Sequence, residues 1–126
     1  FVPTLVGVIL LFLAPLATAA DPEPFTDQRF SELTSAGKNV VLNVHATWCP
    51  TCKRQQPVLL KQVQESRFKD FQILIIDWDT QGKLRRRFNL IIPSTLVVFK
   101  GPIETGREVG LLEPEKIAAL LDTALK

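Results

Sequence analysis

The sequence has few side chains that bind metals through sulfur or imidazole: two cysteines and one histidine among 126 residues. A closed structural zinc site takes four ligands, so these three residues cannot complete one by themselves. All three lie in one short stretch, HATWCPTCKRQQP, which runs from His45 to Pro57. This scarcity and clustering indicate chemistry at a single local site.

The chain also lacks a strong charge of either sign. Its 15 Lys and Arg and 13 Asp and Glu residues give a formal net charge of +2, with both signs mixed along the chain. A protein whose main partner is nucleic acid carries a basic face, so we expect no nucleic-acid partner. No repeat or low-complexity tract is present, and the length fits one domain with a core that needs no disulfide staples.

Charge is absent altogether from the first 20 residues, FVPTLVGVILLFLAPLATAA. Leu5 to Leu13 forms an apolar core of signal-peptide length, and Ala17-Thr18-Ala19 has the small-x-small pattern that signal peptidase reads. We expect residues 1–20 to be a signal peptide or an N-terminal membrane anchor, and the prolines and short apolar core favour cleavage. Either outcome places residues 21–126 outside the cytoplasm, in a bacterial-type periplasm, where disulfides persist.

Apolar periodicity and breaker residues divide the rest of the chain into alternating helices and strands. Residues 21–25 read as a short extended linker to a domain over 26–126, because each proline in DPEP disfavours helix in the residue before it. The expected elements are, in order, a helix that begins at Thr26 and stops at Gly37, strand 39–46, helix 50–68, strand 71–77, a short basic helix 81–89, strand 94–100, strand 107–110 and helix 114–126. This order predicts an α/β fold, with a mixed central β-sheet flanked by helices on both faces.

The Cys49-Pro50-Thr51-Cys52 motif places two thiols at the junction of the predicted strand 39–46 and the helix that follows it. Free backbone N–H groups and the helix dipole at a helix N-terminus favour the thiolate form of Cys49. Pro50 is tolerated at the first helical position, where its missing N–H would be unpaired in any case. Two intervening residues bring Cys52 within bonding distance, so Cys49 can attack a partner disulfide and Cys52 can resolve the mixed disulfide.

Two other interpretations of this motif stay open. Together with His45, the two cysteines could ligate copper in a copper-binding chaperone. The motif could instead be a structural disulfide, although so tight a loop constrains the unfolded chain little. We favour the redox interpretation, which needs neither a metal nor another bound cofactor.

The sequence resembles the thioredoxin superfamily over essentially all of residues 25–126. The resemblance rests on TWCPTCK after a buried strand, on Pro57 five residues beyond the second cysteine, and on IIPSTLVVF, in which Pro93 precedes a strand. It implies the thioredoxin fold and thiol–disulfide exchange with protein clients. It also implies that the Ile92–Pro93 bond is cis and lies against the dithiol, that Ile92 offers main-chain hydrogen bonds to a client, and that Trp48 belongs to the docking surface. The alternatives are a trans proline that begins a strand and a core tryptophan.

Within the superfamily, VVLNVHATWCPTC is similar to the extracytoplasmic, membrane-linked thioredoxins of the TlpA and ResA type. The segment from Phe71 to Pro93 is too short for the insertion those proteins carry, so the spacing is that of a plain thioredoxin. The similarity implies a periplasmic reductase that takes electrons from a membrane thiol transporter and delivers them to a client such as apocytochrome c or a copper-site assembly protein. A disulfide-forming oxidant is the alternative enzyme.

Several residues that tune cysteine reactivity in these families differ here. Asn43 stands where ordinary thioredoxins have a buried aspartate, and Gln55 stands where TlpA and ResA-type proteins have a glutamate, so neither acid can shuttle the proton of the second cysteine. Thr51 is neutral where the oxidase type has a histidine. His45 occupies a position that is usually aromatic, where it either relays a proton and stabilises the thiolate or simply fills the aromatic slot.

A basic run, Arg85-Arg86-Arg87, follows the second predicted strand. It reads as the solvent side of a short helix, with attraction of acidic partners or lipid headgroups as the alternative. The nearby Trp78 receives no predicted role.

Overall fold

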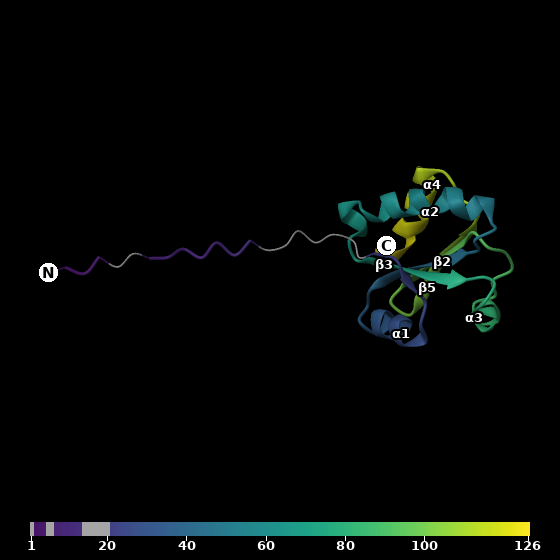
Figure 1. Ribbon diagram of the computed structural model, residues 1–126, viewed down its shortest axis with the longest axis horizontal. Helices are drawn as coiled ribbons and strands as arrows, with labels where there is room; N and C mark the ends of the chain where they lie inside the picture. The colour runs from purple at the N-terminus through teal and green to yellow at the C-terminus, as the bar shows by residue number, and fades with distance from the viewer. Residues whose placement is uncertain (1, 5–6, 14–20) are drawn as a thin grey trace.

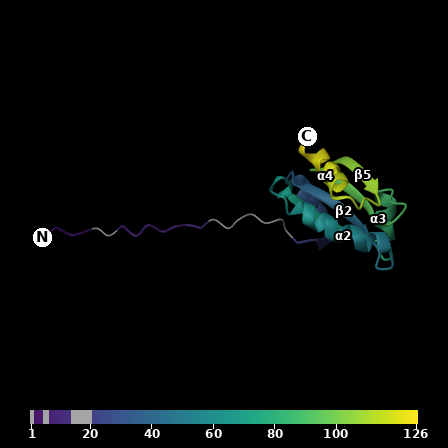
Figure 2. The ribbon, with the colours of Figure 1, turned by 90° about the horizontal axis from the view of Figure 1, so that it is seen from above.

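A five-stranded mixed sheet forms the centre of the domain in the computed structural model, which describes residues 2–4, 7–13 and 21–126 (Figure 1, Figure 2). Its strands are β1 (Glu23–Pro24), β2 (Asn39–His45), β3 (Phe71–Asp77), β4 (Thr95–Lys100) and β5 (Ile103–Val109), in the order β1-β3-β2-β4-β5. β1 and β2 both run parallel to β3, β4 is antiparallel to β2, and β5 is antiparallel to β4. The predicted mixed sheet is confirmed.

Helices cover both faces of this sheet, as predicted. In Figure 1, α2 (Pro50–Val63) and α4 (Pro114–Asp122) lie above the sheet, and α1 (Asp27–Ser35) and α3 (Gly82–Arg87) lie below it. Two 3-10 turns, η1 (Ser66–Phe68) and η2 (Thr123–Leu125), follow α2 and α4. The observed helix α2 ends at Val63, five residues before the predicted end at residue 68. The chain turns after Val63, and of the next five residues only Phe68 returns to the core.

The alternation of side chains along β2 divides the core into two layers. Val41 faces α2 and α4, whereas Val40 and Leu42 face α1 and α3, and all three are fully buried. A strand covered on both faces needs apolar residues at successive positions, which explains the nearly continuous apolar run. Asn43 shares a face with Val41, so this polar side chain lies on the α2 side of the sheet.

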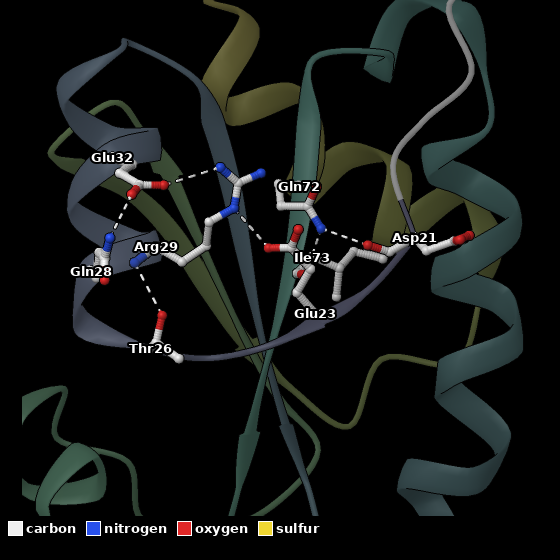
Figure 3. A network of polar contacts seen from close by, with 8 residues as sticks. All are labelled: Asp21, Glu23, Thr26, Gln28, Arg29, Glu32, Gln72 and Ile73. Atoms are coloured by element: carbon white, nitrogen blue, oxygen red, sulfur yellow. Dashed lines mark hydrogen bonds and ion pairs between the residues drawn. The ribbon is translucent and has the colours of Figure 1, made fainter.

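The predicted linker at residues 21–25 differs from what the structure shows. Glu23 and Pro24 pair with β3 as an edge strand, and Phe25 is buried with 3% of its surface exposed. Figure 3 shows the polar contacts that hold this segment: Arg29 donates to the Glu23 carboxylate at 2.8 Å, and the Gln72 amide donates to the Asp21 carbonyl at 2.7 Å. An edge strand tolerates proline because its outer N–H needs no partner, so extended DPEP sequence is compatible with pairing.

The N-terminal prediction falls partly outside the described residues. Ala17-Thr18-Ala19, the expected cleavage pattern, is among the residues that the structure does not describe. Across residues 2–4, 7–13 and 21–126, no helix combines the length and the hydrophobicity needed to cross a membrane.

Candidate active site

The CxxC motif sits where β2 passes into α2. β2 ends at His45, and the Cys49 N–H donates to the Ala46 carbonyl at 3.1 Å, which closes a tight turn. Cys49 is then the N-cap of α2, and Pro50 is its first helical residue. The Cys52 N–H donates to the Cys49 sulfur at 3.1 Å, so one of the free donors at the helix start is directed at that sulfur. This geometry stabilises negative charge on Cys49 when the pair is reduced.

Cys49 and Cys52 form a disulfide, with 5.3 Å between their Cα atoms. Cys49 is 6% exposed and Cys52 is 1% exposed. Cys49 is therefore the more accessible sulfur of the pair, which agrees with the expectation that Cys49 attacks clients and Cys52 resolves the mixed disulfide. Cys52 is the less exposed cysteine, as the sequence predicts.

Trp48 lies beside the disulfide on the surface rather than in the core. Its side chain is 59% exposed, and its indole Nε1 donates to both carboxylate oxygens of Asp79 at 3.1 Å. The hydrogen bond fixes the ring on the outside of the molecule. The core alternative for Trp48 is wrong.

The loop before β4 brings Pro93 into the same region, but without the predicted cis bond. No cis peptide bond occurs in the part of the chain that the structure describes, so Ile92–Pro93 is trans. The trans isomer of an X-Pro bond is favoured by about 0.5–1 kcal/mol, and the chain reverses here instead through Ser94, whose φ is +65°. Ser94 is held in place because its N–H donates to the Val44 carbonyl at 2.8 Å and its carbonyl accepts from the Gly110 N–H at 3.0 Å.

The main chain of Ile92 is partly occupied. Its carbonyl accepts from the Thr95 hydroxyl at 2.7 Å, while its N–H donates no hydrogen bond within the described residues. The amide is therefore the group of Ile92 that is free for a client's backbone. The Ile92 side chain is 46% exposed.

Within residues 21–126, four of the six exposed large apolar side chains (Trp48, Ile91, Ile92 and Val109) lie on segments around the disulfide, and the other two are Ile103 and Leu125. Trp48 precedes it, Ile92 belongs to the Pro93 loop, and Val109 pairs with Thr95 at the end of β5. Gly110 follows Val109, and a Cβ placed on it would meet the Thr51 methyl group at 4.0 Å, which brings the β5 end to the CxxC turn. We call Trp48, Ile92 and Val109 the docking surface. Exposed apolar groups around a reactive centre are suited to binding another protein.

The two positions at which the family resemblance would place an acid, Asn43 and Gln55, hold amides. Asn43 is 2% exposed, its register neighbours are Ile75 in β3 and Leu96 in β4, and its Nδ2 has no hydrogen-bond partner. Gln55 is 1% exposed and donates to the carbonyls of Ser94 and Leu111, which makes it a structural brace between loops. Neither side chain can accept a proton from Cys52.

His45 is half-buried at the end of β2. It lies opposite Asp77 in the β2–β3 register, and its carbonyl accepts from the Trp78 N–H at 2.9 Å. Its imidazole makes no hydrogen bond within the described residues, so the proton-relay hypothesis gains no contact in its favour and stays a prediction. In the same part of the chain, no group of three or more His, Cys, Asp or Glu side chains could hold a metal ion. Cys49 and Cys52 are joined in a disulfide, so the copper-binding alternative gains no support here and stays a prediction.

Sequence reasoning missed Trp78, which packs against the buried cluster of Ala46, Cys49 and Cys52. The Arg85 guanidinium lies over its ring, with 4.6 Å between the Arg85 Cζ and the ring centroid. A signal existed: β2 and β3 are parallel, so the residues that follow them emerge at the same edge of the sheet. Trp78 follows β3 directly, as the CxxC turn follows β2.

Comparison with known proteins agrees with this geometry. Residues 21–123 match the family model described as thioredoxin. The chain is 30% identical to the thioredoxin of Mycoplasma genitalium over 75% of this chain and 91% of the relative, and 33% identical to that of Staphylococcus haemolyticus over 79% and 94%. Among solved structures, Trxlp from Edwardsiella tarda superposes with a TM-score of 0.77 at 29% identity, covering 80% of this chain and 98% of that one. The CxxC disulfide lies at a helix N-terminus in the fold that these relatives share. The chain is therefore a thiol–disulfide oxidoreductase and belongs to the thioredoxin family.

Proposed function

We propose that this protein is a reductase of protein disulfides that works outside the cytoplasm. The observation that carries the proposal is the setting of Cys49: its sulfur caps α2 and accepts the Cys52 N–H, with the docking surface around it. A strong oxidant needs an unusually stable thiolate, which nearby cations provide. Here Thr51 is neutral, Lys53 and Arg54 are exposed to solvent, and the hydrogen bond that the Cys49 sulfur accepts comes from the Cys52 N–H. We therefore take the helix terminus as the main stabiliser of the thiolate. Moderate thiolate stability favours the reducing direction.

The reaction begins with the reduced pair. The Cys49 thiolate attacks one sulfur of a client disulfide, forms a mixed disulfide and expels the other client sulfur as a thiolate, which takes up a proton. The Cys52 thiol then loses its proton and attacks the Cys49 sulfur, which releases the second client thiol. The client disulfide gains two electrons and the Cys49–Cys52 pair loses two. A thiol donor must therefore reduce the pair again.

Asn43 and Gln55 leave the Cys52 proton without a buried acid to accept it, so water or the His45 imidazole is the group that removes it. Water reaches Cys52 only when the client or the loops move, because Cys52 is 1% exposed. We expect a fall in pH to slow the resolving step more than the first attack, because the Cys52 thiol must lose its proton to a weak base whereas the Cys49 thiolate is stabilised by the helix terminus.

We also propose that the protein acts in the periplasm, with a membrane thiol transporter as its electron donor. The uncharged first 20 residues and the similarity of VVLNVHATWCPTC to TlpA and ResA-type proteins support export to the periplasm, as a soluble or membrane-anchored protein. A membrane thiol transporter would then supply electrons. Apocytochrome c and copper-site assembly proteins are the client classes that this similarity favours.

The experiment that tests the proposal compares both directions with the full chain. The reduced protein is mixed with a protein that holds an accessible disulfide, and the oxidised protein is mixed with the same client in its dithiol form. We expect rapid, stoichiometric reduction in the first case and slow exchange in the second. Cys52→Ser should accumulate a mixed disulfide with the client, and Cys49→Ser should form none. Faster oxidation than reduction would instead assign the oxidant function.

A further inference from the structure

An open pocket of about 480 Å³ lies beside the redox centre, between the end of β3, α3 and the loop that leads to Pro93. Its lining includes Trp78, Arg85, Arg86, Asn89 and Ile91. Trp78 is shared with the redox centre, because the same side chain packs on Cys49 and Cys52. Ile91 precedes Ile92 of the docking surface and is 85% exposed. A client bound at the docking surface would therefore extend over this pocket.

Two guanidinium groups converge in the pocket. A Cβ placed on Gly82 would lie 3.3 Å from Nη2 of Arg85 and 3.9 Å from Nη1 of Arg86. The missing side chain of Gly82 thus leaves room for both groups at one point, and the Trp78 ring supports Arg85 from below. Two like charges held so close repel one another, and an anion between them removes that repulsion.

The chain itself supplies no such anion among the described residues. Arg87 pairs with Asp27 and Arg107 pairs with Glu104, but neither Arg85 nor Arg86 forms an ion pair there. The Nε of Arg85 is buried without a hydrogen-bond partner.

The carboxylates closest in sequence to Trp78 already have donors. Asp79 accepts from the Trp48 indole, and Asp77 accepts from the Asp79 N–H at 2.9 Å. The pocket lining holds two arginines and no Asp or Glu. A planar guanidinium matches a carboxylate in a two-point hydrogen bond.

We propose that Arg85 and Arg86, supported by Trp78, bind a Glu or Asp side chain of the client next to its disulfide. The inference rests on the proposed function and adds a preference for client disulfides that have an acidic neighbour. Of the four basic residues on α3, only Arg85 and Arg86 line the pocket, because Lys83 lies outside it and Arg87 pairs with Asp27. Two guanidinium groups suit a single carboxylate, whereas binding to an anionic membrane surface relies on clusters of four to eight free basic residues.

The test uses two peptide disulfides of equal length that differ by Glu or Gln two residues from one cysteine. We expect the reduced protein to react with the Glu peptide about fivefold to tenfold faster at low salt, and the ratio to fall as salt is added. In the Arg85→Gln/Arg86→Gln double variant the ratio should fall close to one. The matched control is Lys61→Gln/Lys83→Gln, which removes two exposed charges outside the pocket and should retain most of the preference.

A wild-type ratio of one, an unchanged ratio in the arginine variant, or an equal loss in the lysine control would each overturn the inference. Anionic phospholipid vesicles that bind through Arg85 and Arg86 while the peptide ratio stays at one would assign the pocket to a membrane instead. A second readout does not depend on catalysis: the NMR signal of the Arg85 Nε–H in the oxidised protein should shift saturably with a Glu peptide whose cysteines are replaced by serine, and not with the Gln peptide. If neither disulfide is reduced, the proposed function fails, and this titration alone decides whether the pocket binds a carboxylate.

Discussion

The indole Nε1 of Trp48 lies 3.1 Å from both carboxylate oxygens of Asp79, although 31 positions separate these residues in the sequence. The contact joins the turn before the disulfide to the loop after β3. It holds an exposed aromatic ring at one side of the docking surface, where a flexible ring would lose more entropy on binding a client.

Removing the Asp79 carboxylate should weaken client binding without altering the redox pair. We expect Asp79→Ala to raise the KM for a protein disulfide about threefold to tenfold, because a hydrogen bond to a charged group is lost and the ring becomes mobile. The Cys49–Cys52 potential should change little, since no hydrogen bond links Asp79 to either sulfur in the structure. Asp79→Asn keeps an acceptor and should restore part of the affinity. An equal change in potential and KM would contradict this role.

A carboxyl placed at the Asn43 position should destabilise the protein in a pH-dependent way. The site lies between Ile75 and Leu96 and offers no partner, so burial raises the pKa of the carboxyl introduced by Asn43→Asp. A raised pKa means that the cost is small near pH 4 and grows as pH rises, to about 1–3 kcal/mol of unfolding free energy at neutral pH. Denaturant titrations at several pH values measure it.

Asn43→Leu is the control for that substitution. It removes the unpaired Nδ2 without adding a titratable group, so its stability should be close to wild type or higher and should not vary with pH relative to wild type. A cost of Asn43→Asp that does not vary with pH would show that the pKa of the introduced carboxyl is not raised, and that water reaches the site.

Gly110 and Gly37 form a matched pair, with φ values of +70° and +72°. Alanine at either position should cost about 1–2 kcal/mol of unfolding free energy, because L-residues are strained in the left-handed region. Only Gly110 lies at the CxxC turn, where its N–H also fixes Ser94. We expect Gly110→Ala alone to slow client reduction, measured at a temperature where both variants are folded. Equal activity loss in both variants would indicate a general stability effect.

The charge of residue 51 should set the redox potential. Thr51→His places an imidazole in the first turn of α2, where its cationic form stabilises the Cys49 thiolate. Stabilising the reduced form makes the protein more oxidising, and we expect a rise of about 10–30 mV at pH 6 that shrinks at pH 8. Thr51→Gln adds an uncharged polar side chain about as large as histidine, and it should shift the potential less than Thr51→His does. A rise that does not depend on pH would exclude the charge effect.

The parts of the site that are local in sequence were the parts that the sequence predicted. The strand, turn and helix around Cys49 and Cys52 follow from an apolar run, a tolerated proline and a two-residue spacing, all within one short segment. The mixed sheet was predicted from the order of helices and strands, and each of those elements is itself recognised from a local pattern of apolar residues. The trans Ile92–Pro93 bond contradicts an expectation that came from family resemblance alone, since nothing local in that sequence sets the isomer.

Contacts that depend on strand register could not be read from local pattern. Trp78 reaches the redox centre because β2 and β3 are parallel and end together, and Arg85 reaches Trp78 because Gly82 leaves space at the start of α3. The pairing of β1 with β3 was missed because two residues of strand next to prolines have no periodicity to detect. Through these contacts Arg85 lies beside the active site. The basic run alone, on a short helix, does not predict that position.

The equilibrium reduction potential of the Cys49–Cys52 pair distinguishes a reductase from an oxidant. The oxidised fraction is measured in dithiothreitol or glutathione buffers of known potential. A moderately stabilised thiolate predicts a value near that of thioredoxin, about −270 mV, at which the reduced pair can donate electrons to clients. A value near about −120 mV would contradict the account, because it would show a strongly stabilised thiolate and a protein that oxidises its clients.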